Sequence, residues 1–308
     1  MDRLAAMHLF VRVAERGSFS AVALQMGVAR SVVTRQIAAL EAHLGVKLLA
    51  RSTRRLALTS AGGAYLEKCR VILNLVESAE TGLAEERHVP RGPIRLSLPL
   101  SFGIRHLAPL MLEFATQFPE VTLDMDYSDR RSNLFEEGLD MAIRISGRLE
   151  PGDVARRISS GRMMVFASPD YLARHGEPRH PSELIHHECL GYTGAPSPQS
   201  WEFLIDGEAK NFPVRSRLQA NNGDVLMQAA ICGFGLAYEP TFIGADALAA
   251  GQVRQILSEF PIPELGIHAV LPGNRHVPHR VRVLMDFLVE RLGGSPPWES
   301  MVDSAKII

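Results

Sequence analysis

Residues 18–45, SFSAVALQMGVARSVVTRQIAALEAHLG, decide how the N-terminal part of the chain folds. Within this stretch Val33, Ile37 and Leu40 recur at steps of four and three residues, which is the spacing of one buried helix face. Gly27 stands where a preceding short helix would end in left-handed backbone. The opposite face of the second helix then carries small, polar and cationic residues, namely Arg30, Ser31, Thr34, Arg35 and Ala38. The stretch predicts two short helices joined by a tight turn.

The flanking segments extend this unit in both directions. Apolar residues recur at helical spacing from Leu4 to Ala14, and Gly17 ends that helix before Ser18 begins the next one. After Gly45, residues 47–59 form two short alternating runs around a basic turn, a pattern that predicts a β-hairpin wing.

The exposed face of the helix after Gly27 has the composition of a DNA-reading surface. Short hydroxyl side chains allow close approach to the major groove, and guanidinium groups can hydrogen-bond guanine or grip phosphate. The plainer alternative is a solvated basic surface. We expect the major-groove contacts from Arg30, Ser31, Thr34 and Arg35, and phosphate or minor-groove contacts from Arg51, Arg54 and Arg55.

Charge and composition support a separate N-terminal unit. The 308 residues, 46% of them hydrophobic, suggest two or three domains. Residues 1–59 contain nine Lys and Arg against three Asp and Glu, a net +6, whereas the remainder carries 24 against 31, a net -7. The three cysteines form no CxxC pattern, and we find neither a signal-peptide core nor an apolar run of about 18 residues. These features predict a cytoplasmic protein with no membrane segment.

A long helix is expected to follow, from Thr59 to about residue 87, where Pro90 to Pro93 break it. It carries an apolar stripe at heptad-like spacing, made of Tyr65, Cys69, Ile72, Val76, Ala79 and Leu83. One helix cannot bury such a stripe alone, so we expect a partner helix and hence a homodimer. The alternative is that the stripe packs on the C-terminal part of its own chain.

Residues 94–292 alternate between strand and helix patterns, which predicts an α/β fold with parallel strands. Strands are expected at 94–98, 121–127, 141–145, 163–167, 201–205, 236–238 and 267–271, and helices at 107–118, 224–232, 242–249 and 281–292. The last strand and helix look like a return to the first block of the fold.

The chain resembles the LysR-type transcriptional regulators. The matching residues are Phe19 to Ala21, Leu24, Gly27, Val28, Val33 to Ile37, Leu40, Glu41, Leu44, Gly45, Leu48, Arg51, Leu58, Thr59, Ala61 and Gly62, with Ser168 to Leu172, Cys232 to Leu236 and Asp286 to Leu288 further on. The chain departs from the family at Ala29, Arg30 and Ala50, where Ser, Gln and Phe are usual.

The resemblance implies an N-terminal all-α winged helix-turn-helix, a long linker helix, and a two-lobed α/β effector domain like that of periplasmic binding proteins. It also implies double-stranded promoter DNA and a small-molecule effector as ligands, and assembly into a homodimer and further into a homotetramer. The expected boundaries are 1–59 for the DNA-binding domain, 60–91 for the linker helix and hinge, 92–162 with 267–292 for lobe 1, and 163–266 for lobe 2. We expect residues 293–308 to form a disordered tail.

In a two-lobed α/β domain, ligand groups lie at the C-terminal ends of strands. That rule selects Ser101, Arg144, Ser146, Thr193, Asn221, Asn222 and Glu239. Each has a structural alternative: Ser101 and Asn222 can cap helices, and Arg144 can pair with Asp126 or Asp140. Together they favour a small polar or carboxylate-bearing effector, with Arg144 as the anion partner.

Enzyme interpretations find no support in the motifs. Gly233-Phe-Gly235 lacks the third glycine of a dinucleotide loop, and no Walker or HExxH motif occurs. We expect no catalytic residues, no metal and no cofactor. A solute-binding protein would account for residues 94–292 but would leave the basic N-terminal unit unused. The sequence therefore favours a ligand-responsive DNA-binding regulator.

Overall fold

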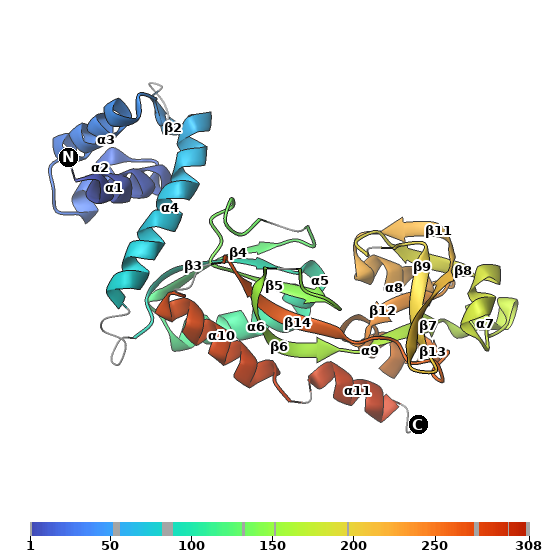
Figure 1. Ribbon diagram of the computed structural model, residues 1–308. Coiled ribbons are helices and arrows are strands. Elements are labelled where there is room, and N and C mark those ends of the chain that lie inside the picture. Colours follow the sequence, from blue (N-terminus) through green and yellow to red (C-terminus); the bar gives the residue numbers. More distant parts are fainter. Residues whose placement is uncertain are drawn as a thin grey trace. The chain divides into compact units, whose positions relative to one another are not determined.

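The computed structural model describes residues 2–51, 56–81, 89–130, 133–150, 152–195, 197–273, 277–294 and 296–305. The chain forms two compact units, a helical one made mainly of residues 1–89 and an α/β one made mainly of residues 90–308 (Figure 1). Within the described residues, no helix is long and apolar enough to cross a bilayer.

The N-terminal unit is a three-helix bundle with a hairpin and a longer fourth helix. Its elements are α1 (Arg3–Arg16), α2 (Phe19–Gln25), α3 (Arg30–Leu44), β1 (Leu49–Arg51), β2 (Leu56–Leu58) and α4 (Ser60–Thr81). Side-chain oxygens of Asp2 and Ser18 cap α1 and α2 by accepting from backbone amides, whereas Ala29 provides no side-chain cap for α3. The buried stripe of α3, Val33, Ile37 and Leu40, is at most 1% exposed, so the predicted core face of this helix is confirmed.

Polar contacts fix the hairpin to α3 and to the start of α4. The Glu41 carboxylate, 7% exposed, accepts hydrogen bonds from Lys47 Nζ (2.6 Å) and from the amides of Leu48 (3.0 Å) and Leu49 (3.2 Å). Thr59 Oγ1 donates to the Lys47 carbonyl (2.7 Å) and accepts from the Gly62 amide (2.9 Å), so it caps α4 as expected. A Cβ on Gly62 would lie 1.9 Å from the Leu48 carbonyl oxygen, so only glycine allows this approach.

The face that α4 buries against its own chain includes two positions of the expected partner-facing stripe. Cys69 is fully buried in the core of the N-terminal unit, and the Tyr65 ring lies 5.8 Å from that of Phe10. These two stripe positions therefore pack on their own chain, because α1 offers them an apolar surface at the same level of the helix. The Ala79 side chain and Leu83 lie outside the described residues.

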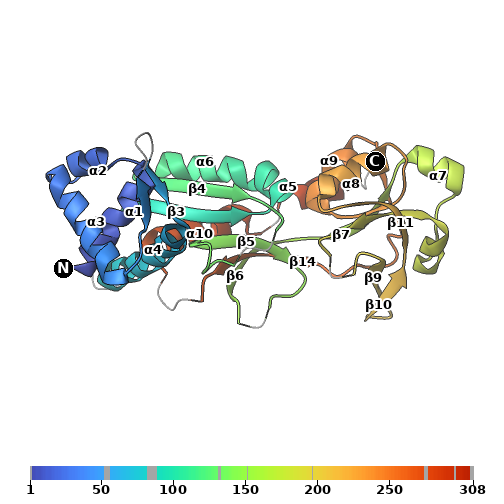
Figure 2. The same ribbon diagram turned by 90° about the horizontal axis from the view of Figure 1, so that it is seen from above.

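Lobe 1 of the α/β unit is built on a five-stranded mixed sheet with the order β4-β3-β5-β14-β6. The strands are β3 (Gly92–Leu98), β4 (Val121–Tyr127), β5 (Met141–Ser146), β6 (Val154–Gly161) and β14 (Leu265–Leu271). The helical elements are α5 (Leu100–Phe102), the π-helix η1 (Gly103–Leu107), α6 (Ala108–Gln117) and α10 (His279–Leu292). Figure 2 shows α6 running along β4. α6 also contacts α10, with the ring centroids of Phe114 and Phe287 5.4 Å apart. β3 is parallel to β4 and β5, as predicted, but β14 is antiparallel to both of its neighbours because it returns from lobe 2.

Lobe 2 combines three small sheets. β7 (Met163–Ala167) lies between β12 (Ala237–Pro240) and β13 (Arg254–Ile256), β8 (Glu188–Tyr192) is parallel to β11 (Arg215–Ala220), and β9 (Ser200–Ile205) forms a hairpin with β10 (Glu208–Pro213). Its helices are α7 (Pro169–His175), the 3-10 helix η2 (Pro181–His186), α8 (Gly223–Ile231) and α9 (Thr241–Ala249). The chain passes from lobe 1 to lobe 2 between β6 and β7 at Arg162, and returns between β13 and β14.

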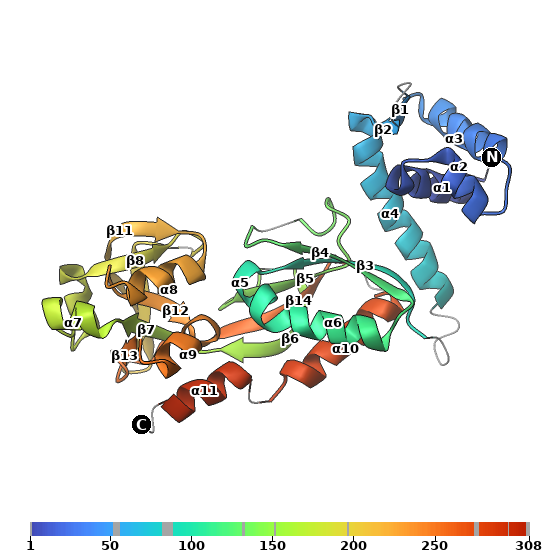
Figure 3. The ribbon, with the colours of Figure 1, turned by 180° about the vertical axis from the view of Figure 1, so that it is seen from behind.

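The C-terminal segment contradicts the expectation of a disordered tail. Residues Pro297–Ala305 form a helix, α11, which lies beside α9 (Figure 3). Trp298 and Val302 of this helix are 2% and 0% exposed. A helix with two buried apolar residues one turn apart is held by packing, so the expectation was wrong for these residues.

Candidate DNA-binding surface and effector site

The expected DNA-reading residues share the solvent face of α3. Arg30, Ser31 and Arg35 are exposed and Thr34 is half-buried, while the stripe on the other side of the helix lies in the core. Among the described residues, neither Arg30 nor Arg35 forms an ion pair, so both guanidinium groups are available to a ligand. Arg54, Arg55 and the side chain of Arg51 lie outside the described residues, so their role stays a prediction.

Two of the expected effector residues meet where the lobes contact each other. Ser101, in α5 of lobe 1, is 7% exposed, and its Oγ accepts a hydrogen bond from Asn222 Nδ2 of lobe 2 (3.1 Å). Asn222 also caps α8, because its Oδ1 accepts from the Val225 amide (3.2 Å). Asn222 therefore caps a helix, as the structural alternative predicted, and also forms a hydrogen bond between the lobes.

The other expected residues divide between strand ends and turns. Arg144, on β5, donates from Nη1 to the Arg130 carbonyl (3.3 Å) and is half-buried. Ser146 Oγ donates to the Arg148 carbonyl and accepts from the Arg148 amide (3.1 Å), so its hydrogen bonds stabilise its own turn. Thr193 and Asn221 are exposed beyond the ends of β8 and β11.

Glu239 is a buried carboxyl group beside the N-terminus of α8. It is 3% exposed, and its Oε1 has no hydrogen-bond partner within the described part of the chain. A Cβ on Gly223 would lie 2.5 Å from Glu239 Oε2, which places the carboxyl group directly against the first turn of that helix. Burial, and then the carboxylate of Asp224, raise the pKa of Glu239 to about 8. Both effects favour the protonated form of this carboxyl group.

The inter-lobe contact contains residues that the sequence reasoning missed. Arg105 of η1 pairs with Asp224 (2.5 Å) and Asp246 (3.0 Å) of lobe 2, and a ring nitrogen of His106 lies 3.1 Å from the Phe242 carbonyl oxygen. Strand-end reasoning could not select these residues, because Arg105 and His106 lie inside a helical segment.

Asp129 and Tyr192 are a second omission, and here a signal was present. Asp129 follows the end of β4 and accepts from the Leu100 amide (3.0 Å). Tyr192 ends β8; burial, and then the charges of Asp129 and Glu239, raise its pKa to about 12. Tyr192 therefore lies near acidic groups of both lobes. The strand-end rule applied to the expected strand 121–127 points to Asp129, whereas the sequence predicts no strand over 188–192, so the rule gives no reason to select Tyr192.

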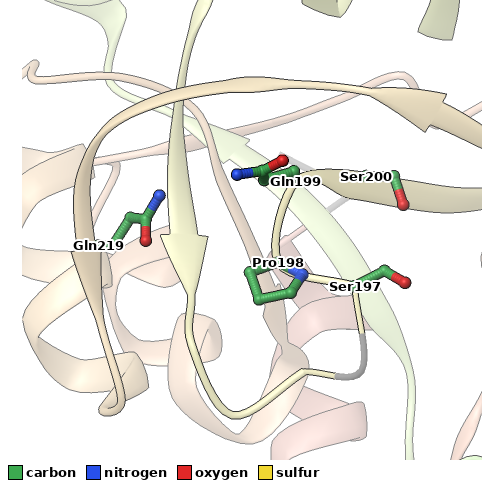
Figure 4. A pocket seen from close by; sticks show the side chains of 5 residues that line it. All are labelled: Ser197, Pro198, Gln199, Ser200 and Gln219. Carbon is green, nitrogen blue, oxygen red and sulfur yellow. The ribbon is translucent and has the colours of Figure 1, made fainter.

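Lobe 2 contains a polar cavity of about 390 Å³. Figure 4 shows its lining, which consists of Ser197, Pro198, Gln199, Ser200 and Gln219. Gln219 belongs to β11, three residues before Asn222, and the other residues lead into β9. The cavity thus lies on the strand that ends at the inter-lobe contact, and its amide and hydroxyl groups can bind a polar ligand.

Comparison with known proteins covers both units. Residues 4–63 match the family described as bacterial regulatory helix-turn-helix protein, lysR family, and residues 87–293 match the LysR substrate binding domain. An HTH-type transcriptional regulator of Xanthomonas campestris is 38% identical over 92% of this chain and 84% of its own length. The regulator CrgA of Neisseria meningitidis serogroup C is 35% identical over 93% of this chain and 96% of its own.

Solved structures give the same result for the fold. CrgA from Neisseria meningitidis, described as a LysR-type transcriptional regulator, superposes with a TM-score of 0.60 at 33% identity, covering 94% of this chain and 99% of that chain. Full-length AphB, described as a virulence activator of Vibrio cholerae, superposes with a TM-score of 0.58 at 28% identity, covering 94% of this chain and 99% of that chain.

Proposed function

The chain belongs to the LysR family of bacterial transcriptional regulators, and on that premise we propose how its own residues read DNA and sense an effector. Proteins of this family bind promoter DNA and small-molecule effectors. For this chain we place the DNA-binding domain at 1–59, the linker at 60–91, lobe 1 at 92–162 with 267–292, and lobe 2 at 163–266. We place the protein in the cytoplasm, where its DNA ligand is.

In this proposal α3 enters the major groove and presents Arg30, Ser31, Thr34 and Arg35 to the bases. The observation that carries it is the exposed cationic face of α3 opposite a fully buried stripe. A helix held by its inner face can insert its outer face into the groove without losing core contacts. We assign Arg51, Arg54 and Arg55 to phosphate or minor-groove contacts.

We propose that a small polar or carboxylate-bearing effector binds where the lobes meet. Support comes from the Ser101–Asn222 hydrogen bond, since a ligand that replaces it would hold groups of both lobes. Arg144 is the proposed anion partner, with Thr193, Asn221, Asn222 and Glu239 around the ligand. We assign Ser146 to its own turn, because its hydroxyl group forms hydrogen bonds with Arg148 two residues away.

The DNA-binding proposal is tested by titrating operator and random DNA across a salt series. Arg30→Ala should cost about 1 to 3 kcal/mol on the operator and relax specificity at one base position. Arg54→Ala should weaken binding to every sequence alike and reduce the slope of log K against log salt by about 1.

Two results would contradict the assignment. If both variants lost affinity equally on operator and random DNA, Arg30 would not read bases. If the unmodified protein showed no salt-dependent binding to promoter DNA, the alternative function, solute binding by residues 94–292 alone, would gain support.

A further inference from the structure

The C-terminal helix α11 lies beyond the segment that the model of the substrate binding domain matches. The match to the substrate binding domain ends at residue 293, whereas α11 covers Pro297–Ala305. Figures 1 and 3 show α11 along α9, close to the passage between the lobes. Its buried residues Trp298 and Val302 therefore pack on a surface that the rest of the effector domain provides.

The Trp298 side chain contacts lobe 1. Its ring centroid lies 4.6 Å from that of His106 and 5.3 Å from that of Phe102, which it meets edge-on. Its Nε1 donates to the Ser160 carbonyl at the end of β6 (3.3 Å).

The Glu299 side chain contacts lobe 2 and the connection between the lobes. Its Oε1 accepts from Thr241 Oγ1 (2.6 Å), at the start of α9, and from the amide of Arg162 (2.9 Å). Arg162 is the single residue between β6 and β7, and its guanidinium group bonds Glu299 as well as Asp303 (2.7 Å). Glu299 is only 13% exposed, so its charge-assisted bonds to Arg162 are largely shielded from water, whereas Asp303 is 62% exposed.

We propose that α11 is a clasp that fixes the angle between the two lobes. One turn of the helix is bonded to lobe 1 through Trp298, to lobe 2 through Glu299, and to the connecting residue Arg162 through side chain and backbone. A rotation of the lobes about Arg162 must break or shift these contacts. The clasp thus sets how easily the lobes change their arrangement, and a two-state change of that kind is what an effector would bias.

The test measures lobe mobility without an effector, so its result does not depend on the proposed effector site. Spin labels are attached to cysteines replacing the exposed residues Glu120 of lobe 1 and Glu208 of lobe 2, in full-length protein carrying Cys232→Ser. Labelled chains are mixed with excess unlabelled protein, so that pulsed electron resonance reports distances within one chain.

We expect a narrow distance distribution for the parent protein, and a wider or shifted one for Glu299→Ala and for Trp298→Ala. The matched control is Glu113→Ala, which removes an ion pair with Arg291 between α6 and α10, inside lobe 1. The control should keep the parent distribution.

An unchanged distribution in Glu299→Ala, with circular dichroism showing a folded chain, would overturn the proposal. Equal broadening of the distance distribution in Glu113→Ala would overturn the proposal too, because removal of any ion pair in the domain would then increase lobe mobility. If Trp298→Ala fails to fold, Glu299→Ala decides alone, since it removes hydrogen bonds but little of the apolar packing.

Discussion

At the residue scale, Ala29 leaves the first turn of α3 without a side-chain cap. Its backbone is already extended, with φ -67° and ψ 143°, as a cap residue requires. Ala29→Ser should therefore stabilise α3 by about 1 kcal/mol. Where amide exchange occurs through local opening of the helix, this stabilisation corresponds to roughly fivefold slower exchange. Hydrogen exchange of the α3 amides measures this. Ala38→Ser, on the exposed middle of the same helix, is the control and should not slow exchange.

The stabilisation that Glu41 gives to the packing of the hairpin on α3 should depend on pH. Burial raises its pKa, but the hydrogen bonds from Lys47, Leu49 and Leu48 outweigh burial and leave the pKa below its ordinary value. The stabilisation is thus present above the ordinary glutamate pKa, about 4.3, and is lost as pH falls through the lower folded value.

Glu41→Gln should cost on the order of 1–3 kcal/mol at neutral pH, because it removes a charged acceptor from two amides and a lysine. Hydrogen exchange across residues 41–51 measures this. The difference in exchange rate between variant and parent should disappear as the pH falls from the ordinary glutamate pKa through the lower pKa of folded Glu41. A difference that does not depend on pH would mean that the charge of the carboxylate does not stabilise this region.

At the element scale, α4 still presents an exposed stripe on the side away from its own core. Ala61, Ala64, Lys68, Ile72 and Leu75 are all exposed and recur at steps of three and four residues. Among those members of the expected seam whose side chains the structure describes, Ile72 alone belongs to this stripe. Ile72 is 36% exposed and Leu75 is 40% exposed. We propose that this stripe meets the α4 helix of a second chain.

Ile72→Glu and Leu75→Glu should each shift the protein from dimer to monomer, because a carboxylate in the seam would be buried without a partner. Sedimentation velocity over a concentration series measures the shift. Leu24→Glu on α2, where the native side chain is 85% exposed, is the control and should stay dimeric. A dimer that survives both seam variants would place the interface elsewhere.

Sequence patterns predicted the elements that bury a regular stripe and missed those that do not. The steps between Val33, Ile37 and Leu40 were enough for α3, because burial of that face is a local property. β10 is almost entirely exposed, so its residues carry no alternation to detect. α11 buries Trp298 and Val302, and the Trp298 ring meets Phe102 and Phe242, which come from distant parts of the chain. The same limit hid Arg105 and His106, whose partners exist only once the lobes have folded.

At the scale of the whole molecule, the effector response should depend on the inter-lobe residues and leave DNA affinity untouched. Ser101→Ala and Arg144→Ala should each abolish the change in transcription caused by an inducing compound, with basal operator affinity nearly unchanged, because neither residue belongs to the DNA-binding unit. A promoter–reporter screen with small carboxylic acids, followed by operator titration, measures both quantities.

Ser146→Ala is the matched control for this experiment. Its hydroxyl group bonds within its own turn in the described structure, so the variant should respond normally. A normal response in the Ser101→Ala, Arg144→Ala double variant would place the effector elsewhere, and the polar cavity lined by Gln199 and Gln219 would be the next position to test.

The contact between Gly62 and the Leu48 carbonyl has a mechanical consequence. Because a methyl group has no room at this contact, and Thr59 and Glu41 form hydrogen bonds across it, we expect the base of the hairpin, α3 and the first turn of α4 to move as one rigid body. A rotation of α4 about its axis would then be transmitted to α3 and would not be taken up by bending at Gly62. The DNA-reading face would turn together with the linker helix.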